Sequence, residues 1–202
     1  MNAPINAFDL VVLAVLVAGL LCGRRRGMSE ELVGLLKWLV LVVGCALLYQ
    51  PLGSAFAGSS SVFSLLSCYL MAYIAAGMAI HGLFILFKRL VGGKLLGSDF
   101  FGAAEYYLGM GSGLVRFTCI LLVGMALLNA RGYDANEVRA MQNFQQREFG
   151  SVSFPTLHTV QATVFDESLT GTMVRDHLGF LLIQRTKPEN KEFRQREYSM
   201  PE

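Results

Sequence analysis

Four long apolar stretches alternate with short polar stretches over the first two thirds of the chain. The apolar stretches run from about 5 to 23, 32 to 49, 62 to 87 and 106 to 128, and each contains at most two ionisable residues. A helix needs roughly 20 mostly apolar residues to cross a bilayer, because lipid offers no partner to an unpaired backbone group. The pattern therefore predicts an all-α membrane protein with four transmembrane helices.

The remaining third of the chain has a different pattern. After a break at Ser153, Phe154 and Pro155, apolar residues recur at near-helical spacing: Leu157, Val160, Val164, Phe165, Leu169 and Met173. Such a segment docks on its own bundle or the membrane surface more often than on a partner. We therefore divide the chain into a transmembrane domain (1–129), an amphipathic, partly helical extra-membrane segment (130–183) and a flexible polar tail (184–202).

Composition agrees with this division. Hydrophobic residues make up 53% of the chain and charged residues only 16%, which is rare for a soluble domain of 202 residues. Of the 32 charged residues, 13 lie in 1–129 and 19 in 130–202. The net charge of +2 is too small and too mixed to indicate a nucleic-acid surface. The lipid bilayer is the expected partner.

Basic residues predict how the helices are oriented. The connection between the first two spans and the one between the last two are basic, whereas 50–61 contains no Lys or Arg. Short cytoplasmic loops retain Lys and Arg, so the first and third connections are expected inside and both termini outside, on the periplasmic side. No basic residue precedes the first span, and we expect this span to be retained rather than cleaved as a signal sequence. The basic residues are Arg24, Arg25, Arg26, Lys88, Arg89 and Lys94.

The residue types that carry catalysis or bind metals are sparse. One cysteine falls in each span, and the chain has no CxxC or Cys/His spacing, so we interpret the cysteines as packing residues. His81 is alone in the third span, where a proton relay or haem ligand is the less favoured alternative to packing. We expect no catalytic residues, no metal and no cofactor. The cysteines are Cys22, Cys45, Cys68 and Cys119.

The connection between the first two spans concentrates Gly and charged residues. Gly23 and Gly27 allow a tight reversal, Arg25 and Arg26 face anionic headgroups, and Glu31 lies at the positive end of the next helix. A hairpin that satisfies the positive-inside rule explains these residues without any activity. From their chemistry alone, a structural role and a functional role for these residues are equally supported.

The fourth span contains one costly residue and a strip of small ones. Arg116 lies near the middle of the span, where an arginine costs roughly 2.5 to 3.5 kcal/mol on insertion scales. We predict that its guanidinium pairs with Glu31. In the alternative, residues 98–111 lie along the interface and Arg116 extends inward to the headgroups. Gly109 and Gly113, four residues apart, would let another helix approach closely.

Two motifs stand out in the chain. The first consists of Asn6, Phe8, Asp9, Leu10, Gly23, Arg25, Arg26, Gly27, Glu31, Leu32 and Trp38. The second, 108–116 in the fourth span, has the pattern Leu-Gly-x-x-x-Gly-Leu-x-Arg and follows an acidic residue, Glu105. Together they resemble the motifs of a bacterial family, the colicin V production (CvpA) proteins. The likeness covers about residues 6–128 and departs from the family pattern at Glu30, Tyr106 and Phe117.

The resemblance implies an inner-membrane accessory of colicin V production or export, a toxin biosynthetic process, and of envelope homeostasis. An envelope or secretion protein, or a second copy of the chain, is then the expected partner. Some relatives carry a periplasmic serine protease domain after the helices, but no Ser, His and Asp constellation appears here, so a non-enzymatic role is implied. The alternative is a transporter or channel subunit for ions or small solutes. Its polar path would be lined by Asp9, Lys37, His81, Glu105 and Arg116.

Overall fold

The computed structural model describes residues 6–59, 63–91, 104–150 and 155–187. Over these residues the chain is helical with no strand, which confirms the all-α prediction. Four helical stretches are long and apolar enough to cross a membrane: Ala7–Met28, Glu31–Ser59, Leu65–Leu90 and Glu105–Asn129. The helices are α1 (Ala7–Ser59), α2 (Leu65–Val91), α3 (Glu105–Asn129), α4 (Ala135–Phe149), α5 (Leu157–Phe165), α6 (Leu169–Leu178) and the 3-10 turn η3 (Gly179–Leu181).

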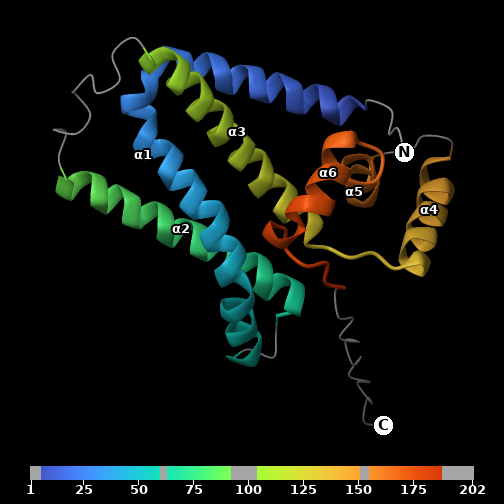
Figure 1. The fold of residues 1–202 in the computed structure, drawn as a ribbon. Helices are drawn as coiled ribbons and strands as arrows, with labels where there is room; N and C mark the ends of the chain where they lie inside the picture. Colours follow the sequence, from blue (N-terminus) through green and yellow to red (C-terminus); the bar gives the residue numbers. More distant parts are fainter. Residues whose placement is uncertain (1–5, 60–62, 92–103, 151–154, 188–202) are drawn as a thin grey trace, which may run out of the picture.

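The first two predicted spans are the two arms of α1, joined at a sharp bend. Gly27 is the only residue inside α1 with a non-helical backbone, at φ 74° and ψ 169°. Residues with a side chain rarely adopt a positive φ, so glycine at this position lowers the conformational free-energy cost of the bend. α3 begins beside the bend and runs between the two arms (Figure 1). The predicted reversal therefore takes a single residue rather than a loop.

The second arm of α1 is longer than the apolar pattern indicated. We predicted a connection over 50–61, but the helix continues through Pro51 to Ser59. Close packing on α2 accompanies this extension: a Cβ at Gly53 would lie 2.3 Å from a ring carbon of Tyr69. The hydroxyls of Ser54 and Ser59 also donate to backbone carbonyls one turn back, so these serines are compatible with a helix.

The extra-membrane helices α5 and α6 pack on the end of the bundle opposite the bend (Figure 1). Phe165 and Ile183 are fully buried and belong to the same apolar cluster as Tyr49, Tyr73 and Ala126 of the spans. The part of the amphipathic segment after residue 155 thus packs on its own bundle, one of the two placements, bundle or membrane surface, that we expected over a partner. We call residues 155–187 the cap.

The surface of the spans is apolar, as lipid requires. Between 17% and 33% of the residues in each span are buried within the protein. Leu47, Met78 and Leu83 are each about two thirds exposed on this surface. In water such a surface would be an aggregation hazard, whereas lipid chains solvate it. Three of the four free cysteines are buried, which agrees with their interpretation as packing residues.

Candidate functional site

A buried ion pair lies beside the bend of α1. Nη1 of Arg116 on α3 donates to both carboxylate oxygens of Glu31, at 2.8 Å and 2.7 Å. The side chain of Glu31 is 1% exposed and that of Arg116 is 12% exposed. Arg26 lies 3.5 Å from the same carboxylate, but its side chain is 57% exposed. The pair predicted from the cost of Arg116 is therefore present, and the helix bearing Arg116 is continuous from Glu105.

Glycines allow the helices around this pair to approach at backbone distance. The first arm of α1 runs antiparallel to α3, with Gly23 against Gly109 and Gly113. A Cβ on Gly23 would lie 2.1 Å from the carbonyl oxygen of Gly109, and one on Gly113 would lie 2.3 Å from that of Gly19. Only residues without a side chain fit at these points, which is the small-residue packing expected for helices in lipid.

Glu105 and the remaining arginines complete this end of the bundle. The carboxylate of Glu105 lies directly against Gly27, where a Cβ would come within 2.8 Å of Oε1. Gly27 is favoured by its positive φ, whereas the flexible Glu105 side chain could move away from a Cβ at this position. Arg25 is exposed, as a headgroup-facing residue should be.

Asp9 has partners that the sequence did not reveal. Its carboxylate accepts from the backbone N–H groups of Leu169 and Thr170, at 3.2 Å and 3.0 Å, and from the Thr170 hydroxyl at 2.6 Å. These N–H groups are the unpaired donors at the start of α6, where a negative charge is favoured. Ser168 accepts from the next free donor, the N–H of Gly171. The outer end of the first span is therefore bound to the cap through a helix N-terminus.

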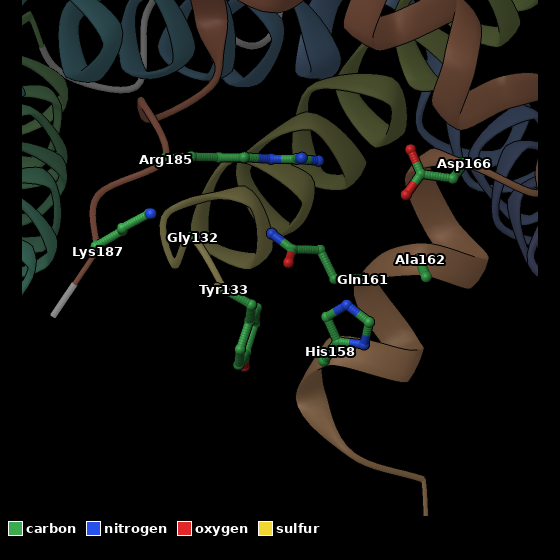
Figure 2. A pocket seen from close by; sticks show the side chains of 8 residues that line it. All are labelled: Gly132, Tyr133, His158, Gln161, Ala162, Asp166, Arg185 and Lys187. Carbon is green, nitrogen blue, oxygen red and sulfur yellow. The ribbon is translucent and has the colours of Figure 1, made fainter. Parts of the chain in front are cut away.

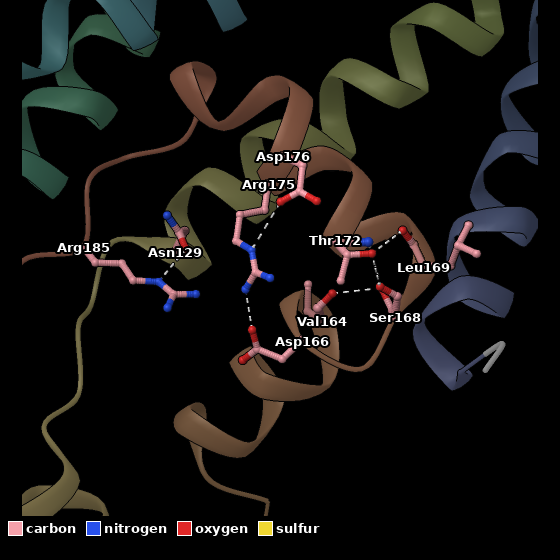
Figure 3. A network of polar contacts seen from close by, with 10 residues as sticks. Asn129, Val164, Asp166, Ser168, Leu169, Thr172, Arg175, Asp176 and Arg185 are labelled. Carbon is pink, nitrogen blue, oxygen red and sulfur yellow. Dashed lines mark hydrogen bonds and ion pairs between the residues drawn. The ribbon is translucent and has the colours of Figure 1, made fainter. Parts of the chain in front are cut away.

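The second and fourth spans also form hydrogen bonds with the cap. The Tyr49 hydroxyl accepts from the N–H of Gln184 at 3.2 Å. Asn129, the last residue of α3, donates to the carbonyl of Ile183 and accepts from Nε of Arg185, both at 3.0 Å (Figure 3). Residues 184–187, which we had placed in the flexible tail, are thus tied to the bundle, while residues 188–202 lie outside the described part. The sequence contains only a weak indication of these contacts, namely a single polar residue near the end of a predicted span.

The candidate residues fall into two groups at opposite ends of the first arm. Asp9 lies at the cap, whereas Arg26, Glu31, Glu105 and Arg116 lie at the bend. The 18 residues from Asp9 to Gly27 span about 27 Å of helix. His81 is exposed on α2. Within the described residues these groups are engaged in separate contacts, and the geometry shows no polar path that joins them.

This architecture defines the class of the protein: a multi-pass α-helical membrane protein whose spans carry a small helical cap at one end. A family model described as Colicin V production protein matches residues 8–153, and the chain belongs to this family. The resemblance seen in the two motifs is thereby confirmed. The family is not a known enzyme family, and membership supports a membrane accessory role. No curated protein and no solved structure matched the chain.

Proposed function

We propose that the protein is a non-enzymatic accessory of colicin V production or export and of envelope homeostasis, located in the bacterial inner membrane. The observation that carries this proposal is the fixed cap, which is hydrogen-bonded to three of the spans through Asp9, Tyr49 and Asn129. A rigid bundle that displays a fixed cap is built to position a surface for a partner. Asp9, Glu31, Arg116 and Asn129 are engaged in contacts that join the helices and the cap.

The distribution of basic residues supports a cap on the periplasmic side. Arg24, Arg25 and Arg26 precede the bend of α1, and Lys88 and Arg89 lie in the last turn of α2. Both positions lie at the end of the bundle away from the cap (Figure 1). The positive-inside rule then assigns the bend to the cytoplasm and the cap to the outside. Fusions of alkaline phosphatase after Lys187 should be active, because this enzyme folds only in the periplasm. Inactive fusions at this point would reverse the proposed orientation.

The exposed surface of the cap provides a direct way to look for the partner. Met173 and Phe180 have large apolar side chains that are 61% and 71% exposed. A photo-crosslinking amino acid at either position, in cells, should capture an envelope or secretion protein. The same group at Leu83, which is 65% exposed on α2, is the matched control and should react mainly with lipid.

The decisive experiment is purification of the crosslinked, tagged protein from its native membrane in mild detergent, with the stoichiometry of every co-purifying protein measured. A stoichiometric envelope or secretion protein supports the accessory role. Recovery of the chain alone, or only as a homo-oligomer, contradicts it and favours the transporter alternative. Solute or ion flux in liposomes that is lost in Asp9→Asn and Arg116→Ala would then establish that alternative.

A further inference from the structure

A polar cavity of about 250 Å³ lies in the cap, just beyond the end of α3. One wall is a face of α5 with His158, Gln161 and Asp166, and the opposite wall is the extended segment with Arg185 and Lys187 (Figure 2). Gly132 and Tyr133, which follow α3, also line it. None of these residues takes part in the ion pair at the bend or in the Asp9 contact.

The walls of the cavity are fixed by hydrogen bonds. The N–H of Gly132 donates to the carbonyl of Thr186 at 3.0 Å, and the N–H of Thr186 donates to the carbonyl of Ala130 at 2.9 Å. Gln161, which is 6% exposed, donates to the carbonyls of Leu128 and Arg131 and so ties α5 to the end of α3. A cavity with pre-formed walls binds a ligand without a large cost in ordering them.

Within the part of the chain that the structure describes, one cation that lines the cavity, Arg185, has no carboxylate partner. Asp166 is paired with Arg175, and Lys187 lies 3.3 Å from Asp134. Nε of Arg185 is used on the neutral amide of Asn129, so its two terminal nitrogens remain for a ligand.

The aromatic side chains of the cavity carry no negative charge that would repel an anion. His158 packs edge to face on Tyr133, with ring centroids 5.2 Å apart. Burial, with a smaller contribution from Glu137, raises the pKa of the Tyr133 phenol, and Arg131 lowers it in part. The phenol is therefore neutral at physiological pH. An anion at this site meets one free guanidinium and no unpaired carboxylate among the lining residues.

The position of the cavity relative to the membrane indicates which anion is available to it. Gly132 and Tyr133 follow the last residue of α3 by three and four positions, so the cavity lies just beyond the end of the fourth span. The headgroup layer of a bilayer is about 5 to 7 Å thick on each side of the hydrocarbon. A fourth span that ends at Asn129 would place the cavity near the lipid phosphates, on whichever side of the membrane the cap lies.

We propose that this cavity is a phosphate-binding site, with Arg185 as the principal ligand and Lys187 and His158 beside it. Guanidinium groups bind phosphate through paired, charge-assisted hydrogen bonds. The phosphate can belong to a lipid headgroup or to a soluble phosphate compound, and the chemistry at Arg185 is the same in both cases. The site is independent of the proposed accessory role and of the orientation of the chain.

Two arms of one experiment test the site and distinguish the sources. In the first, the full-length protein in neutral detergent is dialysed to equilibrium against radiolabelled orthophosphate. In the second, the protein is reconstituted in phosphatidylcholine nanodiscs that contain a minor amount of labelled phosphatidylglycerol, and the lipid retained on extraction into detergent is measured. Saturable binding in the first arm supports a soluble phosphate, and retention in the second arm alone supports a lipid headgroup.

Variants assign the binding to the cavity. Arg185→Gln should weaken binding by about tenfold or more, because a hydrogen bond to a charged group contributes that much affinity. Since Arg185 also contacts Asn129, Lys187→Gln is a second, milder variant that should weaken binding severalfold without disturbing the cap. Arg139→Gln, on exposed α4 outside the cavity, is the control and should bind like the wild type. Absence of binding in both arms, or equal binding by all three variants, would overturn the proposal.

Discussion

The ion pair between Glu31 and Arg116 should be a major determinant of bundle stability. We expect Arg116→Met to lower the free energy of unfolding by about 3 to 4 kcal/mol. The Glu31 side chain is 1% exposed and loses both of its short contacts in this variant, while Arg26 is too exposed to replace them. Removal of one partner from a buried pair costs about 3 to 5 kcal/mol, because an uncompensated charge remains.

The reverse variant separates the effect of charge from that of packing. Glu31→Gln should cost less than Arg116→Met, because Arg116 is 12% exposed and its long side chain can turn toward the headgroups. The double variant should lose clearly less than the sum of the two single losses, as expected for residues in contact. Loss of the arginine also removes a cost of roughly 2.5 to 3.5 kcal/mol for membrane insertion, so poor insertion would not explain a less stable Arg116→Met.

The measurement is reversible unfolding in mixed micelles with increasing SDS. The single tryptophan, Trp38, packs against both apolar clusters of the bundle, and its fluorescence should report the loss of tertiary packing. Arg89→Met, an exposed residue in the last turn of α2, is the control and should stay within about 0.5 kcal/mol of the wild type. A deficit below about 0.5 kcal/mol at pH 7, or strict additivity in the double variant, would refute the reasoning.

Two further variants test the helix contacts. Gly23→Ala should lose about 1 to 3 kcal/mol in the same assay, because its Cβ would lie 2.1 Å from the Gly109 carbonyl; Gly111→Ala, which meets open space, should not be destabilised. Wild-type stability of Gly23→Ala would mean that the helices are not in backbone contact. Asp9→Asn should weaken the capping of α6 by about 0.5 to 2 kcal/mol and speed proteolysis of the cap, whereas Asp176→Asn, 66% exposed, should do neither. Equal cleavage rates would show that Asp9 does not fasten the cap.

Contacts that follow from the cost of a single residue could be anticipated from the sequence. An arginine in the middle of a span needs an acidic partner, and Glu31 was within reach in the opening motif. The same holds for Gly109 and Gly113, because small residues four apart indicate a close helix contact in lipid. A buried charge without a partner is costly, and a pair of glycines in a span has few other uses. Each of these features therefore points to one kind of contact.

Contacts between segments distant in the sequence could not be anticipated. Asp9 near the end of a span needs no partner, since water and headgroups solvate it, and nothing in its surroundings points to residues 169 and 170. The hydrogen bond between Gln184 and Tyr49 could not be anticipated either, because the polar composition after residue 184 indicated a flexible tail. Two backbone hydrogen bonds and the buried Ile183 fix the first residues of this tail.

The sequence alone determined that the protein spans the membrane four times, where each span lies to within a few residues at most ends, and to which family it belongs. Those properties depend on the mean hydropathy of successive segments and on short motifs, both of which involve residues that are close in the sequence. Only the tertiary structure decided that the cap packs on the spans, that Asp9 caps α6, and that Arg185, bonded to Asn129, lies beside a cavity. These depend on pairings across more than 50 residues, and each contributes only about 1 kcal/mol, too little to leave a pattern in the chain.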